Sequence, residues 1–342
     1  MPIRFIALGQ ALIEHDLRKH PYPGFRPLVE RLKRADVCFS NFEGSIKPRA
    51  DATPTREGTF FHGTTPDALA CLTEFSINLL SLSNNHSFDW GAEGILATRD
   101  AAQASGFTTA GTGAILADAT APALLKTPNG KIALVAFASK IPDASRATEA
   151  RPGVSHLCLN DFRQPDPKDA QRILDSIQRA ARDADLVIAY HHDHYWEADQ
   201  QATPRWKQAW ARECIDAGAH TYISHGIPML HGIEIYKAHP IFYGLGNFIF
   251  HTKTPVGKYE PRVWESVIAD CTFAHGKIVG AELVAVALNE AGEPGEEFFE
   301  TRGRPSIADG PQARGIIERL QRISAPYGTL LVTQNDFAQI QL

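Results

Sequence analysis

Short apolar runs alternate with helix-like segments in this chain, and this alternation limits the possible folds more than any other sequence feature. The runs Ile3–Leu8, Val37–Gly44 and Ile77–Leu82 have the length and apolar character of buried strands. Pro23–Ala35 carries apolar residues at helical spacing, and Ala92–Ser105 is a further predicted helix. Strands separated by helices pair in parallel, because each helix carries the chain back to the start of the next strand. The sequence therefore predicts an α/β fold built on parallel strands.

The alternation continues and then changes its character after residue 225. The other main predicted elements are the helices Asp169–Ala184, Pro204–Ala217 and Gln312–Ile323 and the strands Asp185–Tyr190, His220–Ser224, Val263–Phe273, Lys277–Leu288 and Gly328–Thr333. Strands near the C-terminus follow one another without helices, which favours antiparallel pairing. No repeat or low-complexity tract marks a boundary. We therefore predict one domain over 1–342, with a parallel α/β half (1–225) and a more antiparallel half (226–342).

Two connecting segments carry turn residues. Ala123–Thr127 and Ile132–Ser139 flank the sequence Pro-Asn-Gly-Lys, and its Asn-Gly pair favours a hairpin with a type I′ turn. Lys140–Asp166 contains three prolines and no clear periodicity, so we predict a peripheral loop or lid there.

The charge pattern excludes several classes of protein. The net charge is −5, and no basic stripe of the kind that binds nucleic acid is present. No basic amphipathic face points to a membrane surface, and no run approaches the roughly 20 apolar residues that span a bilayer. Glu14 and Asp16 follow the first apolar stretch too closely for a signal peptide. We expect a cytoplasmic protein whose partner is a small-molecule substrate rather than nucleic acid or membrane.

The cysteines favour neither disulfides nor a zinc finger. There are five, an odd number, and they are far apart with no Cys-x-x-Cys pair: Cys38, Cys71, Cys158, Cys214 and Cys271. Disulfide frameworks and closed zinc sites need regular, close spacings. Buried free thiols are the simplest interpretation.

Histidine is distributed unevenly, and polar residues follow successive predicted strands. Eight of the fourteen histidines lie between residues 191 and 251. The polar residues at strand ends are Gln10, Asn41, Glu43, Asn84, Asn85, His86, Asp89, His191, His192, His194 and His225, with His231 beyond. Ligands of α/β sheets bind just past the carboxyl ends of the strands. Each residue alone could cap a turn or lie in a solvated loop, but their equivalent positions favour a shared site. Imidazole, carboxylate and amide ligands suit zinc, manganese or iron better than calcium.

Several sequence blocks resemble the CapA family, named for poly-γ-glutamate capsule synthesis. The blocks are ADVCFSNFEGSI, LLSLSNNHSFDWGAEGI, DLVIAYHH, ISHGIPMLHGIEIYKAHPIFYGLGNFIF and RGIIERLQRISAPYGT. The family's fold is similar to that of the calcineurin-like metallophosphatase superfamily. The resemblance thus implies a β-sandwich flanked by helices, in four layers ordered αββα.

The resemblance also implies roles for single residues. Glu43 takes the place of the bridging carboxylate ligand, Asn85 that of the amide-oxygen ligand, and His192 and His225 those of the imidazole ligands. His86 takes the place of the acid that protonates a leaving group. Asp89 is three residues further on, a spacing from which we infer that it orients His86.

Two positions depart from the family's pattern. Where the family has a metal-binding aspartate the chain has Gln10, and where it often has a histidine the chain has Pro228. Both losses fall on one metal position, so we expect one divalent ion per chain. Residues that could rebuild that position or bind substrate are Gln10, His15, Asp16, His191, His194, His231 and Asn247.

These features predict a metal-dependent hydrolase. A water bound to the ion would attack a small acidic or amide substrate at a C–N or γ-glutamyl bond. Three alternatives are a phosphoesterase, a non-catalytic accessory protein of capsule biosynthesis, and a protein that binds a metabolite without turning it over. The sequence determines neither the substrate, nor the metal, nor the oligomeric state.

Overall fold

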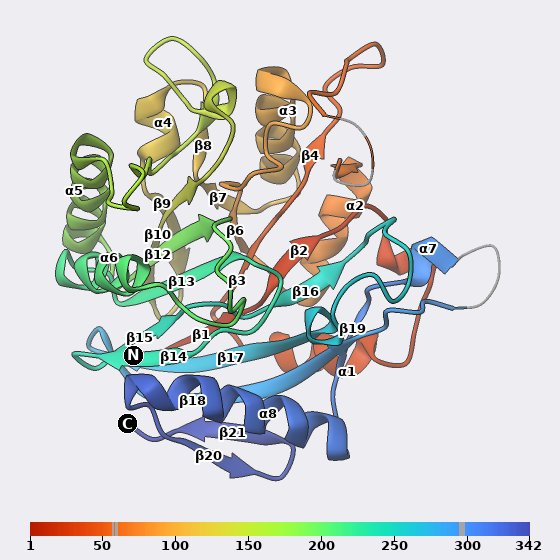
Figure 1. The fold of residues 1–342 in the computed structure, drawn as a ribbon. Coiled ribbons are helices and arrows are strands. Elements are labelled where there is room, and N and C mark those ends of the chain that lie inside the picture. The colour runs from red at the N-terminus through yellow and green to blue at the C-terminus, as the bar shows by residue number, and fades with distance from the viewer. Residues whose placement is uncertain (57, 59–60, 294–297) are drawn as a thin grey trace.

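Two β-sheets pack face to face, and helices cover the outer side of each (Figure 1). The computed structural model describes residues 1–56, 58, 61–293 and 298–342. The first sheet has the strand order β20-β21-β18-β17-β1-β3-β6-β7, with β19 paired to β18. Its strands are β1 (Ile3–Ala7), β3 (Val37–Asn41), β6 (Leu79–Ser81), β7 (Thr108–Ala110), β17 (Glu265–Ala274), β18 (Lys277–Leu288), β19 (Pro305–Ile307), β20 (Leu331–Gln334) and β21 (Phe337–Ile340).

The second sheet has the order β14-β15-β13-β12-β10-β9. Its strands are β9 (Ala123–Thr127), β10 (Gly130–Ser139), β12 (Leu186–Asp193), β13 (Thr221–Gly226), β14 (Ile233–Tyr236) and β15 (His239–Phe242). The strands β10, β12, β13 and β15 pair in parallel, as do β1, β3, β6 and β7 of the first sheet. The parallel strands of each sheet therefore end at the same edge.

Residues on alternate sides of the strands form separate apolar layers. In β1, Phe5 belongs to the core between the sheets together with Ile188 of β12, whereas the next residue, Ile6, belongs to the core shared with α1 (Phe25–Leu32). In β12, Val187 packs on the outer side with α5 (Pro167–Asp183) and α6 (Arg205–Asp216). Each fully buried aliphatic side chain contributes about 1.5–3 kcal/mol to folding. The predicted αββα arrangement is confirmed.

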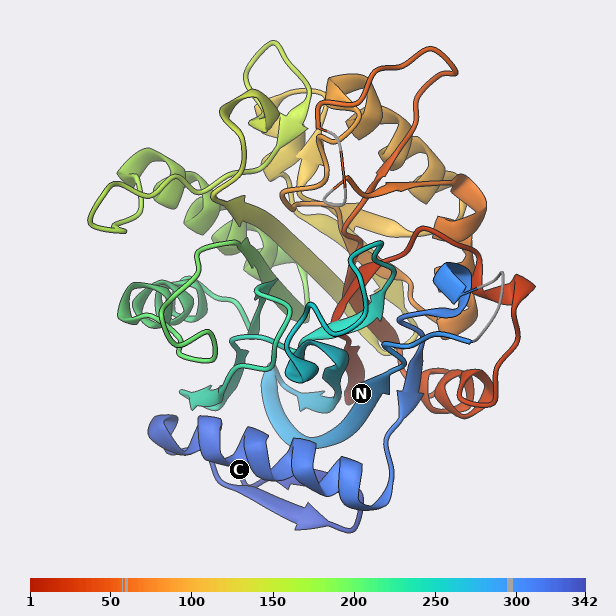
Figure 2. The ribbon, with the colours of Figure 1, turned by 45° about the vertical axis from the view of Figure 1, so that its right-hand side comes forward.

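Further helices complete the outer layers. On the side of the first sheet, α2 (Pro66–Ala70) begins after Thr65, whose hydroxyl accepts a hydrogen bond from the Ala68 amide, and α3 (Gly91–Ala104) follows. The C-terminal helix α8 (Gly310–Ser324), blue in Figure 2, is not part of an outer layer: its apolar side packs on β14, β18 and β21 and joins the core between the sheets. Among the described helices, none combines the length and apolar character that crossing a bilayer requires.

Two strands of the second sheet run further than the sequence predicts. β12 continues to Asp193 and β13 to Gly226, so that His191, His192 and His225 lie within strands rather than after them. The extension follows from pairing, because His192 and His225 are register partners. Successive side chains of a strand point to opposite faces. The adjacent histidines 191 and 192 therefore enter different environments.

One predicted turn also differs. The hairpin of β9 and β10 is confirmed, but Thr127 pairs with Gly130, which makes Pro128 and Asn129 the central turn residues. A type I′ turn needs positive φ at both central positions, and proline fixes φ near −65°. The Asn-Gly signal is therefore overridden by the proline that precedes it.

Candidate metal centre

A cavity of about 490 Å³ lies where strands of both sheets end. Its lining includes five predicted site residues: Gln10, Glu43, Asn85, His86 and His194. The other lining residues are Leu12, Arg56, His62, Lys140, Ile141, Pro142, Trp196, Gly226, Pro228, Phe250 and Tyr259. At Gly226, φ is +129° and a Cβ atom would lie 2.0 Å from the carbonyl oxygen of Asp193, so only glycine lets β13 end this close to β12.

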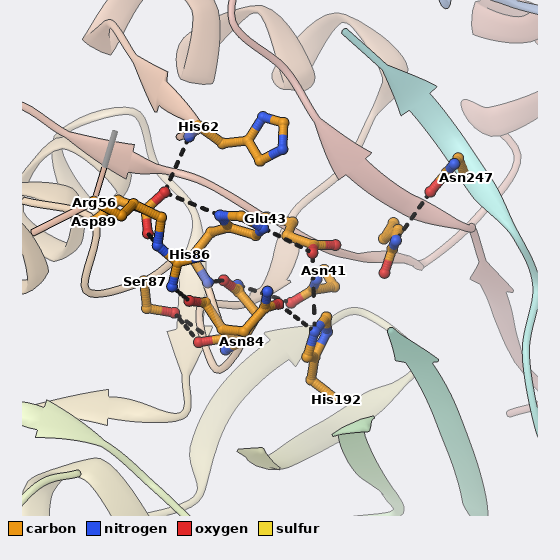
Figure 3. A network of polar contacts seen from close by, with 12 residues as sticks. Asn41, Glu43, Arg56, His62, Asn84, His86, Ser87, Asp89, His192 and Asn247 are labelled. Atoms are coloured by element: carbon orange, nitrogen blue, oxygen red, sulfur yellow. Dashed lines mark hydrogen bonds and ion pairs between the residues drawn. The ribbon is translucent and has the colours of Figure 1, made fainter. Parts of the chain in front are cut away.

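Three of the four predicted ligands come close together at the base of this cavity. The His192 Nε2 atom lies 2.7 Å from Asn85 Oδ1 and 3.8 Å from Glu43 Oε1. Glu43 follows β3 and Asn85 follows β6, both in the first sheet, whereas His192 belongs to the second. Figure 3 shows Glu43 pointing toward both His86 and His192. Residues far apart in the sequence thus meet at the junction of the sheets.

Glu43 is buried without a full set of partners. Its side chain is 3% exposed, and among the described residues no group donates a hydrogen bond to Oε2. Burial, with a smaller effect of the Asp89 charge, raises the pKa of Glu43 to about 8. A charged carboxylate here is unfavourable unless a cation lies beside it.

His225, the fourth predicted ligand, lies beside His192 on the neighbouring strand, and neither histidine lines the cavity. The ligand atoms of Glu43, His192 and His225 do not all lie within 4.8 Å of one another, so the structure does not bring the fourth ligand together with the other three. It is buried, and neither ring nitrogen has a hydrogen-bond partner among the described residues. Burial lowers the pKa of His225 to about 3, and it lowers the pKa of His192 well below its usual value. Both rings are therefore neutral, which is the form that binds metals.

His86 forms a chain of contacts with two neighbours (Figure 3). Its Nδ1 lies 2.9 Å from Asp89 Oδ2, and Arg56 Nε lies 2.8 Å from Asp89 Oδ1. Because an ionised carboxylate can only accept, His86 Nδ1 carries a proton and Nε2, 3.8 Å from Glu43 Oε1, faces the cavity. Burial, followed by the charges of His62 and Arg56, lowers the pKa of His86 well below its usual value. Burial raises the pKa of Asp89 to about 6.

Asparagines hold the loop that carries Asn85 and His86. Asn84 donates hydrogen bonds to the Phe42 carbonyl at 2.7 Å and to Asn41 Oδ1 at 3.3 Å. Its own Oδ1 accepts from the His86 amide. Asn41 and Asn84 thus have positioning contacts that account for their places at strand ends.

A second part of the cavity, next to Glu43, is built of amides: the Glu43 amide donates to the carbonyl of Ala11, the residue after Gln10. Gln10 in β2 (Gln10–Leu12) and Asn247 in β16 (Asn247–Phe250) are register partners, and Gln10 Nε2 donates to Asn247 Oδ1 at 2.9 Å. Gln10 Oε1 is buried and has no partner among the described residues. Pro228 lines the same cavity and offers no side-chain ligand.

Several other predicted residues lie elsewhere. Asp16 caps the 3₁₀ turn Leu17–Lys19 and pairs with Arg18 at 2.8 Å. His191 faces the helix layer, where its ring nitrogens lie 2.7 Å from the hydroxyls of Ser139 and Tyr222. His231 Nδ1 contacts the Met229 carbonyl at 3.2 Å. None of Asp16, His191 and His231 lines the cavity.

Two more histidines flank these groups. His194 lines the cavity and stacks on His192, with ring centroids 6.1 Å apart. His15 packs at a tilt against His251, with ring centroids 5.2 Å apart, and is not part of the lining.

Sequence reasoning missed Arg56, His62 and Lys140. The His62 ring packs against His86 with centroids 4.4 Å apart, and its Nδ1 lies 3.1 Å from Glu14 Oε1. Arg56 and His62 belong to an irregular segment between β4 (Ser45–Ile46) and β5 (Gly63–Thr64), where no periodicity indicates which side chains turn inward.

The fold and the cavity together define a four-layer αββα protein with a carboxylate, an amide and neutral histidines gathered at the strand ends. Residues 4–252 match the model of the family described as bacterial capsule synthesis protein PGA_cap. The chain belongs to this family, which confirms the resemblance drawn from its sequence blocks.

Relatives of known sequence agree with this assignment. An uncharacterized protein of Sinorhizobium fredii, y4sH, is 30% identical over 98% of this chain and 92% of its own length. The PGA biosynthesis protein CapA of Bacillus subtilis is 30% identical over 65% of this chain and 55% of its own length. A probable polyglutamine synthesis accessory protein of Mycobacterium tuberculosis is 27% identical over 88% of this chain and 76% of its own length.

Solved structures show more distant likeness. A hypothetical protein from Thermus thermophilus has a TM-score of 0.42 at 14% identity, over 89% of this chain and 96% of that one. Sulfate thiohydrolase SoxB of the same organism also has a TM-score of 0.42, at 11% identity, over 96% of this chain and 51% of that one. Likeness at this level says nothing about function.

Proposed function

We propose that the chain is a metal-dependent hydrolase that cleaves a C–N bond, such as a γ-glutamyl bond, in a small acidic or amide substrate. One divalent cation would be held by Glu43, Asn85, His192 and His225. The observation that carries this proposal is the Glu43 carboxylate, which is buried at the base of an open cavity and has one oxygen without a partner among the described residues. A buried carboxylate among neutral imidazoles is the environment that a divalent cation stabilises.

The groups present fit such an ion. One carboxylate, one amide oxygen and two neutral imidazoles suit zinc, manganese or iron. Glu43 Oε2 and both His225 nitrogens are buried with no hydrogen-bond partner in the described part of the chain. Without an ion, His192 Nε2 donates to Asn85 Oδ1 at 2.7 Å, because an amide oxygen only accepts. Ion binding would shift this proton to Nδ1, which lies 3.5 Å from the Tyr190 hydroxyl, and so make Nε2 a ligand. A bound cation would lower the pKa of a water ligand and polarise the scissile bond.

His86 would move the proton that hydrolysis requires. Its Nε2 carries no proton in the neutral ring and faces Glu43 across the cavity base. It can therefore accept a proton from the attacking water and pass it to the leaving nitrogen. Asp89, held by Arg56, keeps the ring in the required tautomer and stabilises its transient positive charge.

The cavity lining supports an acidic substrate. Two cationic side chains, Arg56 and Lys140, line the cavity, against a single carboxylate among the described lining residues, Glu43. The chain as a whole has a net charge of −5, so the cavity departs from the average of the protein. Trp196 and Tyr259 add apolar walls. An anionic group held by these cations would place its neighbouring bond over Glu43 and His86.

Phosphoester hydrolysis is less well supported. Two ions clamp both the attacking and the leaving oxygen in many phosphoryl transfers. Here the second side of the cavity is occupied by the hydrogen-bonded amides of Gln10 and Asn247. A single ion is sufficient to activate water for attack on an amide carbonyl.

A second candidate function is favoured by the relatives. Two of them are named as a PGA biosynthesis protein and a probable polyglutamine synthesis accessory protein. In that role the chain would assist polymer assembly without hydrolysing a substrate. The amides of Gln10 and Asn247 are consistent with a site that has lost part of its chemistry.

Activity and ion content of the purified chain separate these proposals. The protein would be loaded with manganese, zinc or iron and tested on γ-glutamyl amides, cyclic amides and phosphoesters. We expect one ion in the cavity and amide cleavage, both of which Glu43→Gln abolishes, whereas Glu93→Gln, an exposed control, changes neither. A loaded protein that cleaves none of these substrates would favour the accessory role, and the loss of two ions in Glu43→Gln would refute the single-ion site.

A further inference from the structure

We propose a second cation site, separate from the cavity, formed by His156, Cys158 and Asp169 and suited to zinc or another thiophilic divalent ion. His156 and Cys158 belong to the peripheral segment 141–166, and Asp169 lies in the first turn of α5. None of the three lines the cavity described above. The site does not depend on the proposed hydrolase function.

The three side chains converge closely enough to share an ion. One ligand atom from each (an imidazole nitrogen, the thiol sulfur and a carboxylate oxygen) lies within 4.8 Å of the other two. His156 Nε2 and Asp169 Oδ1 are 3.5 Å apart. Zinc bonds of 2.0–2.3 Å in a tetrahedral site place neighbouring ligand atoms roughly 3.3–3.8 Å apart. The imidazole and carboxylate already have this separation, and a small side-chain rotation brings in the thiol.

The hydrogen bonding of His156 presents a free nitrogen to the site. Its Nδ1 lies 3.4 Å from the Val154 carbonyl oxygen, which can only accept, so Nδ1 carries the proton. Nε2 then faces Asp169 Oδ1 with a lone pair. Two electron-rich atoms at this distance repel each other unless a proton or a cation lies between them. Metal-binding histidines commonly use their other nitrogen to donate to a backbone carbonyl in this way.

The other contacts of Asp169 determine which cation would bind. Arg172 Nη1 donates to Asp169 Oδ1 at 2.7 Å, and the Cys158 amide donates to Oδ2 at 2.9 Å. The Cys158 thiol also hydrogen-bonds this carboxylate, and a bound ion would replace the proton of that thiol. Because Arg172 already offsets the charge of Asp169, affinity must come mainly from sulfur and imidazole. Such ligands select zinc over magnesium or calcium.

A bound ion would fasten the peripheral segment to the helix layer. Without the ion, Asp169 and Arg172 already hold this segment through the Cys158 amide and the His156 carbonyl, the latter at 2.8 Å. The same segment begins with Ile141 and Pro142, which line the cavity. The second site would therefore steady one wall of the cavity from outside it.

Cobalt(II) absorption tests the proposal because the two sites differ in sulfur. A cobalt–thiolate bond gives an intense near-ultraviolet charge-transfer band, and the four ligands proposed around Glu43 include no cysteine. The full chain, reduced with a non-thiol phosphine, would be titrated with cobalt(II) and then with zinc(II). We expect the band in the wild-type protein, its displacement by zinc, and one ion fewer per chain in Cys158→Ser.

Matched variants identify the source of the band. Cys214→Ala, a buried cysteine in α6, should keep the band, and Glu43→Gln should keep it while losing the other ion. His156→Gln should weaken zinc binding by more than about 10-fold even if Cys158→Ser folds poorly. A reduced wild-type protein without the band, or a band that Cys158→Ser leaves unchanged, would overturn the site. Neither result would affect the proposal for Glu43.

Discussion

The two sides of the cavity hold their polar groups in different ways. Around Glu43, a carboxylate oxygen and both nitrogens of His225 are buried without partners among the described residues. On the neighbouring side, Gln10 and Asn247 are joined by a 2.9 Å hydrogen bond, and one amide oxygen remains unpaired within the same described ranges. The ionised carboxylate of Glu43 is therefore favourable only with a cation beside it. The amides of Gln10 and Asn247, by contrast, satisfy most of their hydrogen bonds with each other.

This difference shows what an amide in place of a carboxylate does to a buried site. The exchange removes a charged ligand, and it also supplies an N–H group that can donate a hydrogen bond to a neighbouring side chain. Because Gln10 and Asn247 are register partners on β2 and β16, the replacement hydrogen bond forms within an existing strand pair. We infer that the amide side is stable without an ion and the carboxylate side is not.

The largest expected difference is in ion content, between a variant that removes a side chain from the carboxylate side and one that removes a side chain from the amide side. His192→Ala should weaken ion binding by at least about 100-fold, because it deletes a ligand outright. Gln10→Ala should leave the ion content at its wild-type value. Metal analysis after dialysis measures both, with His275→Asn, an exposed histidine in a turn, as the control. Equal ion loss in both variants would contradict the comparison.

Substitution of His86 tests whether the carboxylate side of the cavity catalyses a reaction in addition to binding an ion. His86→Ala should reduce turnover by about 10²–10⁴-fold, the usual contribution of a proton-transfer group, with ion content unchanged. The measurement is kcat on the best amide substrate beside metal analysis of the same sample. Unchanged turnover would remove His86 from the mechanism.

Restoring charged ligands should convert the amide side into a second ion site. The double variant Gln10→Asp/Pro228→His places a carboxylate and an imidazole in the cavity lining beside Asn247 and near Glu43. We expect the stoichiometry to rise by one ion over the wild-type protein, measured by metal analysis. Gln10→Asn/Pro228→Ala, which changes the same positions without charge or imidazole, should bind as many ions as the wild-type protein. A Gln10→Asp/Pro228→His variant that gains no ion would show that the two sides differ in more than the identity of their ligands.

The smallest effect is a proton released when the ion binds. The pKa of Glu43 is raised to about 8, so the ion-free carboxyl is protonated at pH 7 and must lose that proton to bind a cation. Ion affinity should rise with pH up to about 8 and then level off, while the number of protons released falls from nearly one. Calorimetry in buffers of different ionisation enthalpy measures this number. A proton release that does not fall as the pH passes 8 would assign the proton to another group.

The site residues that follow strands can be predicted from the sequence, whereas the site residues from irregular segments cannot. Apolar runs followed by polar residues identified Glu43, Asn85 and His192 before any contact was known, since strand pairing brings such positions together. Arg56 and His62 come from an irregular segment whose path depends on tertiary contacts, such as the hydrogen bond from the His62 amide to Asp89. Local sequence carries no signal for contacts of that kind.

Strand length explains the other differences. The sequence placed His191 and His192 together after β12, yet pairing with β13 continues through both. Their side chains separate to opposite faces, so His191 contacts Ser139 and Tyr222 instead of the cavity. The strand β21 was missed because Phe337–Ile340 is short and becomes a strand only by pairing with β18 and β20.

The proposed ligands divide evenly between the layers: Glu43 and Asn85 belong to one sheet, and His192 and His225 to the other. A shared ion would then act as a cross-link between the two halves of the sandwich. Treatment with a chelator should lower the melting temperature as well as abolish activity, because an ion that binds only the folded protein stabilises it by mass action. Heat resistance would thus vary with the supply of metal around the protein.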